Sequence, residues 1–177
     1  MSPAIVLCAH GTRDPFGRET VRSVLAAVAE RLPGVEVLEA YVDVHGPDVA
    51  EVVAGLPSAE GDAVAGVVVP LLLAAGYHVH VDIAHAVADR PDVRSTGALG
   101  PDDLLVDVLV DRLGAAGAGR GWPVVLAPAG SSDARAQSGS DSSLHAAMAR
   151  YNAPAESYLV PHARDSLLFL HTKPRHP

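Results

Sequence analysis

The chain has 177 residues, of which 49% are hydrophobic and 4% aromatic, and its formal net charge is -8. This composition is typical of a compact α/β core, of one domain or one domain and part of another, rather than of a disordered chain. The negative charge argues against nucleic-acid binding, which needs a positive surface, and the single cysteine, Cys8, excludes a disulfide framework and favours the cytoplasm.

Four pairs of strand and helix are expected in chain order. Residues 4–9 and 63–70 are continuously apolar strands, whereas 35–42 alternates, as a strand with one exposed face would, and 92–96 is short and polar. The helices are expected to begin where capping residues, glycines or prolines precede apolar residues at helical spacing, near residues 14–15, 46–47, 76–77 and 100–103. No run is apolar and long enough for a signal peptide or a membrane span.

This repeat of strand and helix predicts an open parallel four-stranded sheet with right-handed crossovers and helices on both faces. The two apolar strands suit its centre and the other two its edges, which gives the order 2-1-3-4. Ligands of such sheets bind at the carboxyl ends of the strands, where the strand order reverses. Here that point lies between the first and third strands.

Two histidines follow these two strands. His10 comes directly after the first strand, and His78 follows the third within Gly76-Tyr77-His78. Either residue alone could be an ordinary turn or helix-start histidine. As a pair at one sheet edge, they favour a ligand site for a divalent metal, because neutral imidazole binds cobalt, iron, nickel and zinc. Two ligands are too few for a closed structural site, so the metal would be labile.

Further polar residues accompany this pair. Asp43 follows the second strand at the same edge and could ligate metal or accept a proton, or be a solvated loop acid. Arg13 could bind substrate carboxylates. His45, beside Gly46-Pro47, is expected to be exposed. His78, Asp82 and His85 share a helix face by spacing, which a solvated face explains better than a second metal site.

The chain then begins to repeat itself. After a Gly/Ala-rich linker, residues 124–133 match residues 5–14 at a constant offset, with Ala129 in the place of His10. The repeat fades afterwards, so we expect a domain at 1–116 and a linker with a truncated or degenerate second unit at 117–177. An altered reading frame is the other explanation. We expect residues 134–177 to be less ordered than residues 1–115.

Residues 69–83, VPLLLAAGYHVHVDI, resemble the signature of the sirohydrochlorin chelatases, the class II chelatases of the CbiX/SirB type. Residues 9–14, AHGTRD, resemble the first motif of that family, and residues 97–101 resemble its third loop. His80 and Ala84 depart from it, since a basic residue and a proline are common there. The resemblance covers about residues 4–133.

The resemblance implies a chelatase-like fold and ATP-independent insertion of a divalent metal, Co2+ or Fe2+ with Ni2+ as a further candidate, into sirohydrochlorin, toward cobalamin or sirohaem. It implies that His10 and His78 bind the metal and that an acid near Asp43 assists. Arg13, Gly76 and Tyr77 are expected to contact the tetrapyrrole. Because the second half is incomplete, a homodimer would be one way to supply the other wall of the cleft.

Two other functions remain open. A metal- or tetrapyrrole-binding protein without turnover would keep the histidines and lack the complete cleft. A phosphatase with a phosphohistidine intermediate is suggested by a histidine and an arginine after a strand, but such enzymes need an arginine directly before the histidine, where this chain has Ala9. No nucleotide, nucleic-acid or membrane partner is expected.

Overall fold

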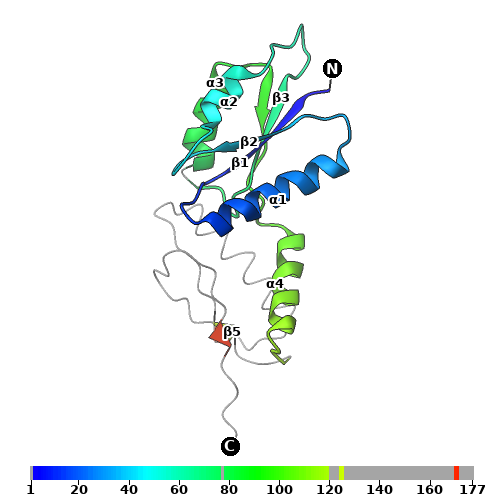
Figure 1. Cartoon of the computed structure of the whole chain (residues 1–177), viewed down its shortest axis with the longest axis vertical. Coiled ribbons are helices and arrows are strands. Elements are labelled where there is room, and N and C mark those ends of the chain that lie inside the picture. Colours follow the sequence, from blue (N-terminus) through cyan, green and yellow to red (C-terminus); the bar gives the residue numbers. More distant parts are fainter. Residues whose placement is uncertain (1, 77, 120–123, 126–169, 172–177) are drawn as a thin grey trace, which may run out of the picture. The chain divides into compact units, whose positions relative to one another are not determined.

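The computed structural model describes residues 2–76, 78–119, 124–125 and 170–171. The chain divides into two compact units, Met1–Leu99 and Gly100–Pro177. The elements of the first unit are β1 (Ala4–Ala9), α1 (Pro15–Arg31), β2 (Val37–Tyr41), α2 (Val49–Gly55), β3 (Gly66–Pro70), the π-helical turn η1 (His78–Ile83), α3 (Ala84–Ala88) and β4 (Val93–Ser95) (Figure 1).

The four strands form a parallel sheet in the order β2-β1-β3-β4, which confirms the predicted order. Cys8 of β1 pairs with Ala40 on one side and with Pro70 on the other. The ends of β1 and β3 therefore lie side by side, and the residues that follow them leave the sheet at the same edge. A backbone hydrogen bond of 2.7 Å from Leu71 N to Cys8 O continues this pairing past the end of β3.

The main hydrophobic core lies between one face of this sheet and the helices α2 and α3. It contains Val6, Cys8 and Val68 from the strands, with Val53 from α2. Ile83, the last residue of η1, is completely buried in the same core. This burial fastens the segment after β3 to the sheet, and truncation of such a side chain to alanine costs about 2–5 kcal/mol.

Helix α1 packs on β2 from the opposite face. Arg22 of α1 lies 3.9 Å from Glu39, which, like Tyr41, belongs to this face by the alternation of the strand. The prediction that β2 has one exposed face was wrong, because Ala40 and Tyr41 are both buried. Tyr41 donates a hydrogen bond to Glu39. The face of β2 on the α1 side therefore combines a buried aromatic ring with polar contacts.

Aspartates cap the starts of α1 and α2. Asp14 caps α1 by accepting a hydrogen bond of 3.1 Å from Phe16 N, and Asp48 caps α2 with one of 2.8 Å from Ala50 N. The second helix therefore begins at Val49, slightly after the Gly46-Pro47 start that was predicted. The third helix also differs from expectation, since its first turn is the π-helical η1. Such turns occur frequently at functional sites.

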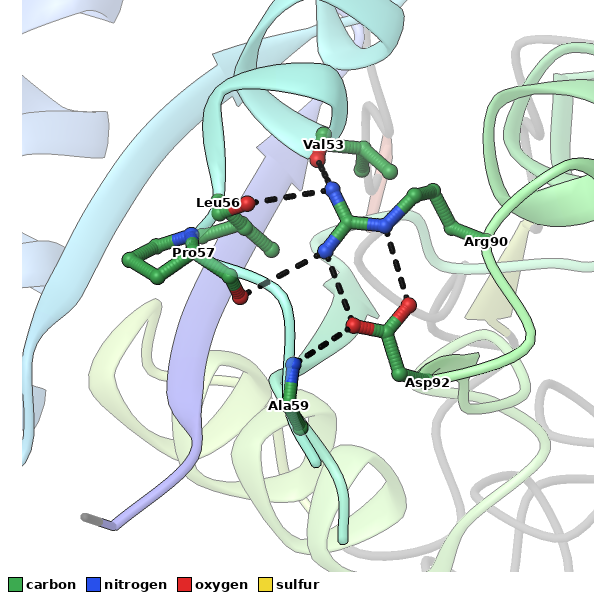
Figure 2. A network of polar contacts seen from close by, with 6 residues as sticks. All are labelled: Val53, Leu56, Pro57, Ala59, Arg90 and Asp92. Carbon is green, nitrogen blue, oxygen red and sulfur yellow. Dashed lines mark hydrogen bonds and ion pairs between the residues drawn. The ribbon is translucent and has the colours of Figure 1, made fainter. Parts of the chain in front are cut away.

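A polar clamp holds the opposite, amino end of β4. Figure 2 shows the guanidinium of Arg90 between the end of α2 and the carboxylate of Asp92. Its Nε and Nη2 donate to the two Asp92 oxygens at 2.9 and 3.0 Å, and Ala59 N donates to the same carboxylate at 3.1 Å. The other guanidinium contacts are with backbone carbonyls of Val53, Leu56 and Pro57.

The second unit contains α4 (Asp103–Ala115), capped by Asp102, with Val106 and Leu113 buried. Two short strands, β5 (Val124–Val125) and β6 (Leu170–His171), pair in antiparallel orientation. The predicted division after residue 116 and the expected disorder of residues 134–177 depend largely on segments outside the described residues, so both stay predictions. In the part of the chain that the structure describes, no helix has the length and apolar character needed to cross a membrane.

Candidate metal-binding site

The turn after β1 presents His10 at the carboxyl edge of the sheet. Gly11 has a φ of 97°, and a side-chain Cβ at this position would lie 2.3 Å from the carbonyl oxygen of Asp43. Asp43 N donates to His10 O at 3.1 Å, which ties the turn to the end of β2. Arg18 of α1 donates from Nε to Thr12 O at 2.9 Å. Hydrogen bonds to its backbone thus hold the turn while the His10 side chain stays exposed.

The segment after β3 presents His78. It is the first residue of η1, and the buried Ile83 holds the other end of that turn in the core. Val79 N donates to Gly76 O at 3.1 Å and closes the approach to the turn. The His78 side chain is about one-third exposed. His78 therefore lies on a helical turn whose other end is buried in the core, whereas the side chain of His10 is exposed.

The two imidazoles meet. Their ring centroids lie 4.6 Å apart and the ring planes are nearly perpendicular, at 87°. A metal about 2.1 Å from one nitrogen of each ring would place the two centroids roughly 4.6 Å apart at an angle of about 90° between the two bonds, and roughly 5.3 Å apart at the tetrahedral angle. The observed contact is an edge-to-face one, and its separation is at the short end of this range, so the two side chains reach the same place at the sheet edge.

Asp82 was not predicted to belong to the site, but the structure joins it to His78. Asp82 Oδ2 lies 2.6 Å from His78 Nδ1, across four residues of η1. The available signal was the spacing of His78 and Asp82, which was attributed to a solvated helix face. Asp82 is instead about one-third exposed and bonded to the histidine.

Asp43 contributes to this edge mainly through its backbone. Its side chain is exposed and its Oδ1 accepts a hydrogen bond of 2.6 Å from Val44 N, in a turn where Val44 has a φ of 65°. Within the described ranges, no three His, Cys, Asp or Glu side chains form a group that could hold a metal. The roles predicted for Asp43 and for the two histidines stay proposals.

Of the three residues expected to contact the substrate, the structure describes Arg13 and Gly76. The side chain of Arg13 is exposed, and Gly76 is half-buried next to η1. Tyr77 lies outside the described residues. Exposed apolar side chains also follow the carboxyl ends of the strands, including Phe16 and Leu73, which are 79% and 51% exposed. Two others are Val44 and Leu99, and Leu99 N donates to Leu72 O at 2.8 Å.

The expectation for His45 was wrong. Its ring packs on Tyr41 with centroids 4.0 Å apart, and its Nδ1 lies 3.0 Å from Gly46 O. Its Nε2 is buried and has no hydrogen-bond partner among the described residues. The proline at position 47 suggested an exposed turn, whereas the side chain folds back over the buried Tyr41.

Comparison with known proteins places this architecture in a family. The sequence profile of the CbiX family matches residues 4–116, which is more than half of the 177 residues. The chain belongs to the CbiX family. The match contains β1 to α4, and with them both histidines of the candidate site.

A curated relative is the sirohydrochlorin cobaltochelatase of Methanococcoides burtonii. It is 26% identical over 123 residues, which cover 61% of this chain and 92% of the relative. Among solved structures, the sirohydrochlorin chelatase SirB from Bacillus subtilis subspecies spizizenii in complex with cobalt has a TM-score of 0.69 and 19% identity, covering 90% of this chain and 67% of SirB. SirB from Bacillus subtilis with Fe3+ has a TM-score of 0.70, also at 19% identity, covering 90% of this chain and 65% of SirB. These structural matches support the chelatase fold.

Proposed function

We propose that this CbiX-family protein is an ATP-independent metallochelatase that inserts a divalent metal, cobalt or iron, into sirohydrochlorin, toward cobalamin or sirohaem. The observation that carries the proposal is the contact of His10 and His78 at the carboxyl edge of the sheet, with ring centroids 4.6 Å apart. The family match and the cobaltochelatase activity named for the Methanococcoides relative support it.

The metal is a substrate in this proposal, bound by the two imidazoles and then released into the macrocycle. Imidazole suits cobalt, iron and nickel, and two protein ligands leave the other coordination positions open for the pyrrole nitrogens. Because His10 is exposed, its ring has room to rotate about its side-chain bonds and turn a nitrogen toward the ion. A site with few protein ligands suits transfer better than storage.

Insertion also requires bases. The divalent ion replaces two N–H protons of the tetrapyrrole, so two protons leave while the four ring nitrogens bind the metal and its bonds to the protein break. Imidazole accepts protons near neutral pH, which makes His10 and His78 candidates once the metal has left them. The Asp43 carboxylate, exposed beside the His10 turn, is a third candidate.

The macrocycle would contact the rim of the same edge. Exposed Leu73, Leu99 and Val44 offer an apolar surface to a flat ring, and the Arg13 guanidinium offers a partner for its carboxylates. We include Gly76 and Tyr77 in this contact because they precede His78. We further propose a cytoplasmic location and a homodimer in which a second copy completes the cleft.

An anaerobic insertion assay tests the proposal. Sirohydrochlorin is mixed with Co2+, Fe2+ or Ni2+ separately, with and without the protein, and insertion is followed by the visible spectrum. We expect the protein to accelerate insertion of cobalt or iron well beyond the rate with metal alone. A protein that binds the metal or the tetrapyrrole and leaves the insertion rate unchanged would favour the alternative function, binding without turnover.

A further inference from the structure

We infer that Asp82 is a positioning residue for His78, which holds the proton of the imidazole on Nδ1 and so directs Nε2 to the metal substrate. This inference rests on the proposed function. Asp82 itself does not contact the metal and acts only through its bond to the His78 ring.

The geometry of the pair carries the inference. Asp82 Oδ2 lies 2.6 Å from His78 Nδ1, slightly closer than the roughly 2.7–2.9 Å of a charge-assisted hydrogen bond from nitrogen to a carboxylate. A carboxylate only accepts hydrogen bonds, so the proton of this bond sits on Nδ1. A metal then binds the ring through Nε2. A carboxylate behind a metal-binding histidine fixes the tautomer and ring orientation in this way and raises the basicity of the ligand nitrogen.

The helical turn makes the carboxylate a fixed partner. Asp82 directly precedes Ile83, which is completely buried in the core, so the backbone at Asp82 has little freedom to move. Asp82 also lines a small hollow together with Val42 and Asp48. Burial raises the pKa of the Cys8 thiol to about 12, and the negative charges of Asp48 and Asp82 add to that effect.

His10 differs in this respect. Its Nδ1 lies 3.4 Å from the carbonyl of the adjacent Gly11, a longer contact with a neutral acceptor, and its side chain is exposed. The two imidazoles therefore have different roles in binding the metal. His78 is the oriented ligand on a rigid turn, and His10 is the adaptable one that can follow the metal as it leaves.

The experiment uses the full chain and four variants. Asp82→Asn removes the charge at nearly constant volume, Asp82→Glu keeps the carboxylate, and Asp89→Asn is a matched control at the exposed end of α3. His78→Ala reports whether His78 binds metal at all. Circular dichroism checks the fold of each variant. Two quantities are measured, the His78 tautomer from long-range 1H–15N spectra of metal-free protein labelled on histidine, and the dissociation constant for Co2+ alone.

We expect the wild type and Asp89→Asn to show His78 as the Nδ1–H tautomer and to bind Co2+ equally. Asp82→Asn should populate the Nε2–H tautomer and bind Co2+ about 10- to 100-fold more weakly, as losses of such outer contacts do. Asp82→Glu should lie closer to the wild type than Asp82→Asn does. The tautomer is the readout that a merely structural role of Asp82 would not change.

Other results would distinguish a failure of the role of Asp82 from a failure of the proposed function. A wild-type spectrum without the Nδ1–H form, or an Asp82→Asn variant with the wild-type dissociation constant, would overturn the role of Asp82. A His78→Ala variant that binds Co2+ as tightly as the wild type would overturn the metal site of the proposed function instead, and the tautomer spectra would still report on the bond between Asp82 and His78.

Discussion

Gly11 packs against the backbone of Asp43 so closely that a Cβ on Gly11 would lie 2.3 Å from the Asp43 carbonyl oxygen. The same two segments are joined by the hydrogen bond from Asp43 N to His10 O. The position of His10 therefore depends on a close approach of two backbones that only glycine permits. Gly11 also has a positive φ, 97°, which L side chains rarely adopt.

Gly11→Ala should destabilise the fold and weaken Co2+ binding together. The matched control is Gly34→Ala, since Gly34 has a similar φ of 83° but open space where a Cβ would lie. The control should lose only the cost of the left-handed backbone, about 1–2 kcal/mol, and should keep its metal affinity. Denaturant unfolding and Co2+ titration measure both effects. Equal losses of stability in the two variants would contradict the close approach at Gly11.

Replacing either histidine of the site should stop insertion and spare the fold. His10→Ala and His78→Ala should each lower the insertion rate by more than about 100-fold, because losing a ligand costs more than losing the contact behind it. His85→Ala, an exposed histidine of α3, is the control and should keep the wild-type rate. Insertion rates are compared with circular dichroism spectra. Unfolding of the His10 or His78 variant would mean that the residue is structural.

The sheet could be predicted because its signals are local and repeated. The continuously apolar residues of β1 and β3 indicated buried central strands, and the repeated strand and helix fixed their parallel direction. The order of the strands then placed His10 and His78 at one edge, which the contact of their rings bears out. A topology rule was sufficient here because His10 directly follows β1 and His78 belongs to the segment that leads from the neighbouring β3 to the next helix.

The side-chain partners could not be predicted in the same way. The bond between Asp82 and His78 depends on a π-helical turn, and hydrophobic periodicity does not distinguish such a turn from an α-helix. The burial of Tyr41 and the half-burial of His45 could not be predicted, because the His45 ring folds back onto the strand in a tertiary contact. The pattern of polar and apolar residues along a strand does not show which side chains are covered by residues from a neighbouring loop.

The clamp at the other end of the sheet should affect stability without affecting the site. Arg90→Ala removes the hydrogen bonds to three backbone carbonyls and to Asp92, so the Tm should fall by about 5–10 °C. Co2+ affinity and insertion rate at a temperature where the variant is folded should be those of the wild type. Arg94→Ala, an exposed arginine of β4, is the control. Loss of metal binding in folded Arg90→Ala would show that the two ends are coupled.

The same clamp should make stability sensitive to acid. The Arg90 guanidinium, together with the Ala59 N–H, holds the pKa of the Asp92 carboxyl well below its usual range. A depressed pKa means that the unfolded chain takes up this proton first, so the stabilisation is complete above the ordinary value of about 3.9 and declines as the pH falls below it. Asp92→Asn should be less stable at pH 7 and should lose less stability on acidification. Denaturation curves between pH 3 and pH 7 measure the difference, and parallel losses in both proteins would count against this assignment.

Cys8 should be inert in the folded protein. Its side chain is completely buried, and burial with the nearby charges of Asp48 and Asp82 raises the pKa of its thiol to about 12. Because the thiolate is the reactive form, a thiol reagent at pH 8 should label Cys8 only as fast as the protein opens, and quickly in denaturant.

A raised pKa of Cys8 also means that the unfolded chain loses this proton first, so stability should decline as the pH rises above about 8.5, the ordinary value for a thiol. Cys8→Ala should lack that alkaline decline while keeping Co2+ affinity and insertion. Rapid labelling of the native protein, or loss of Co2+ binding in a folded Cys8→Ala variant, would instead make Cys8 an accessible thiol or a metal ligand.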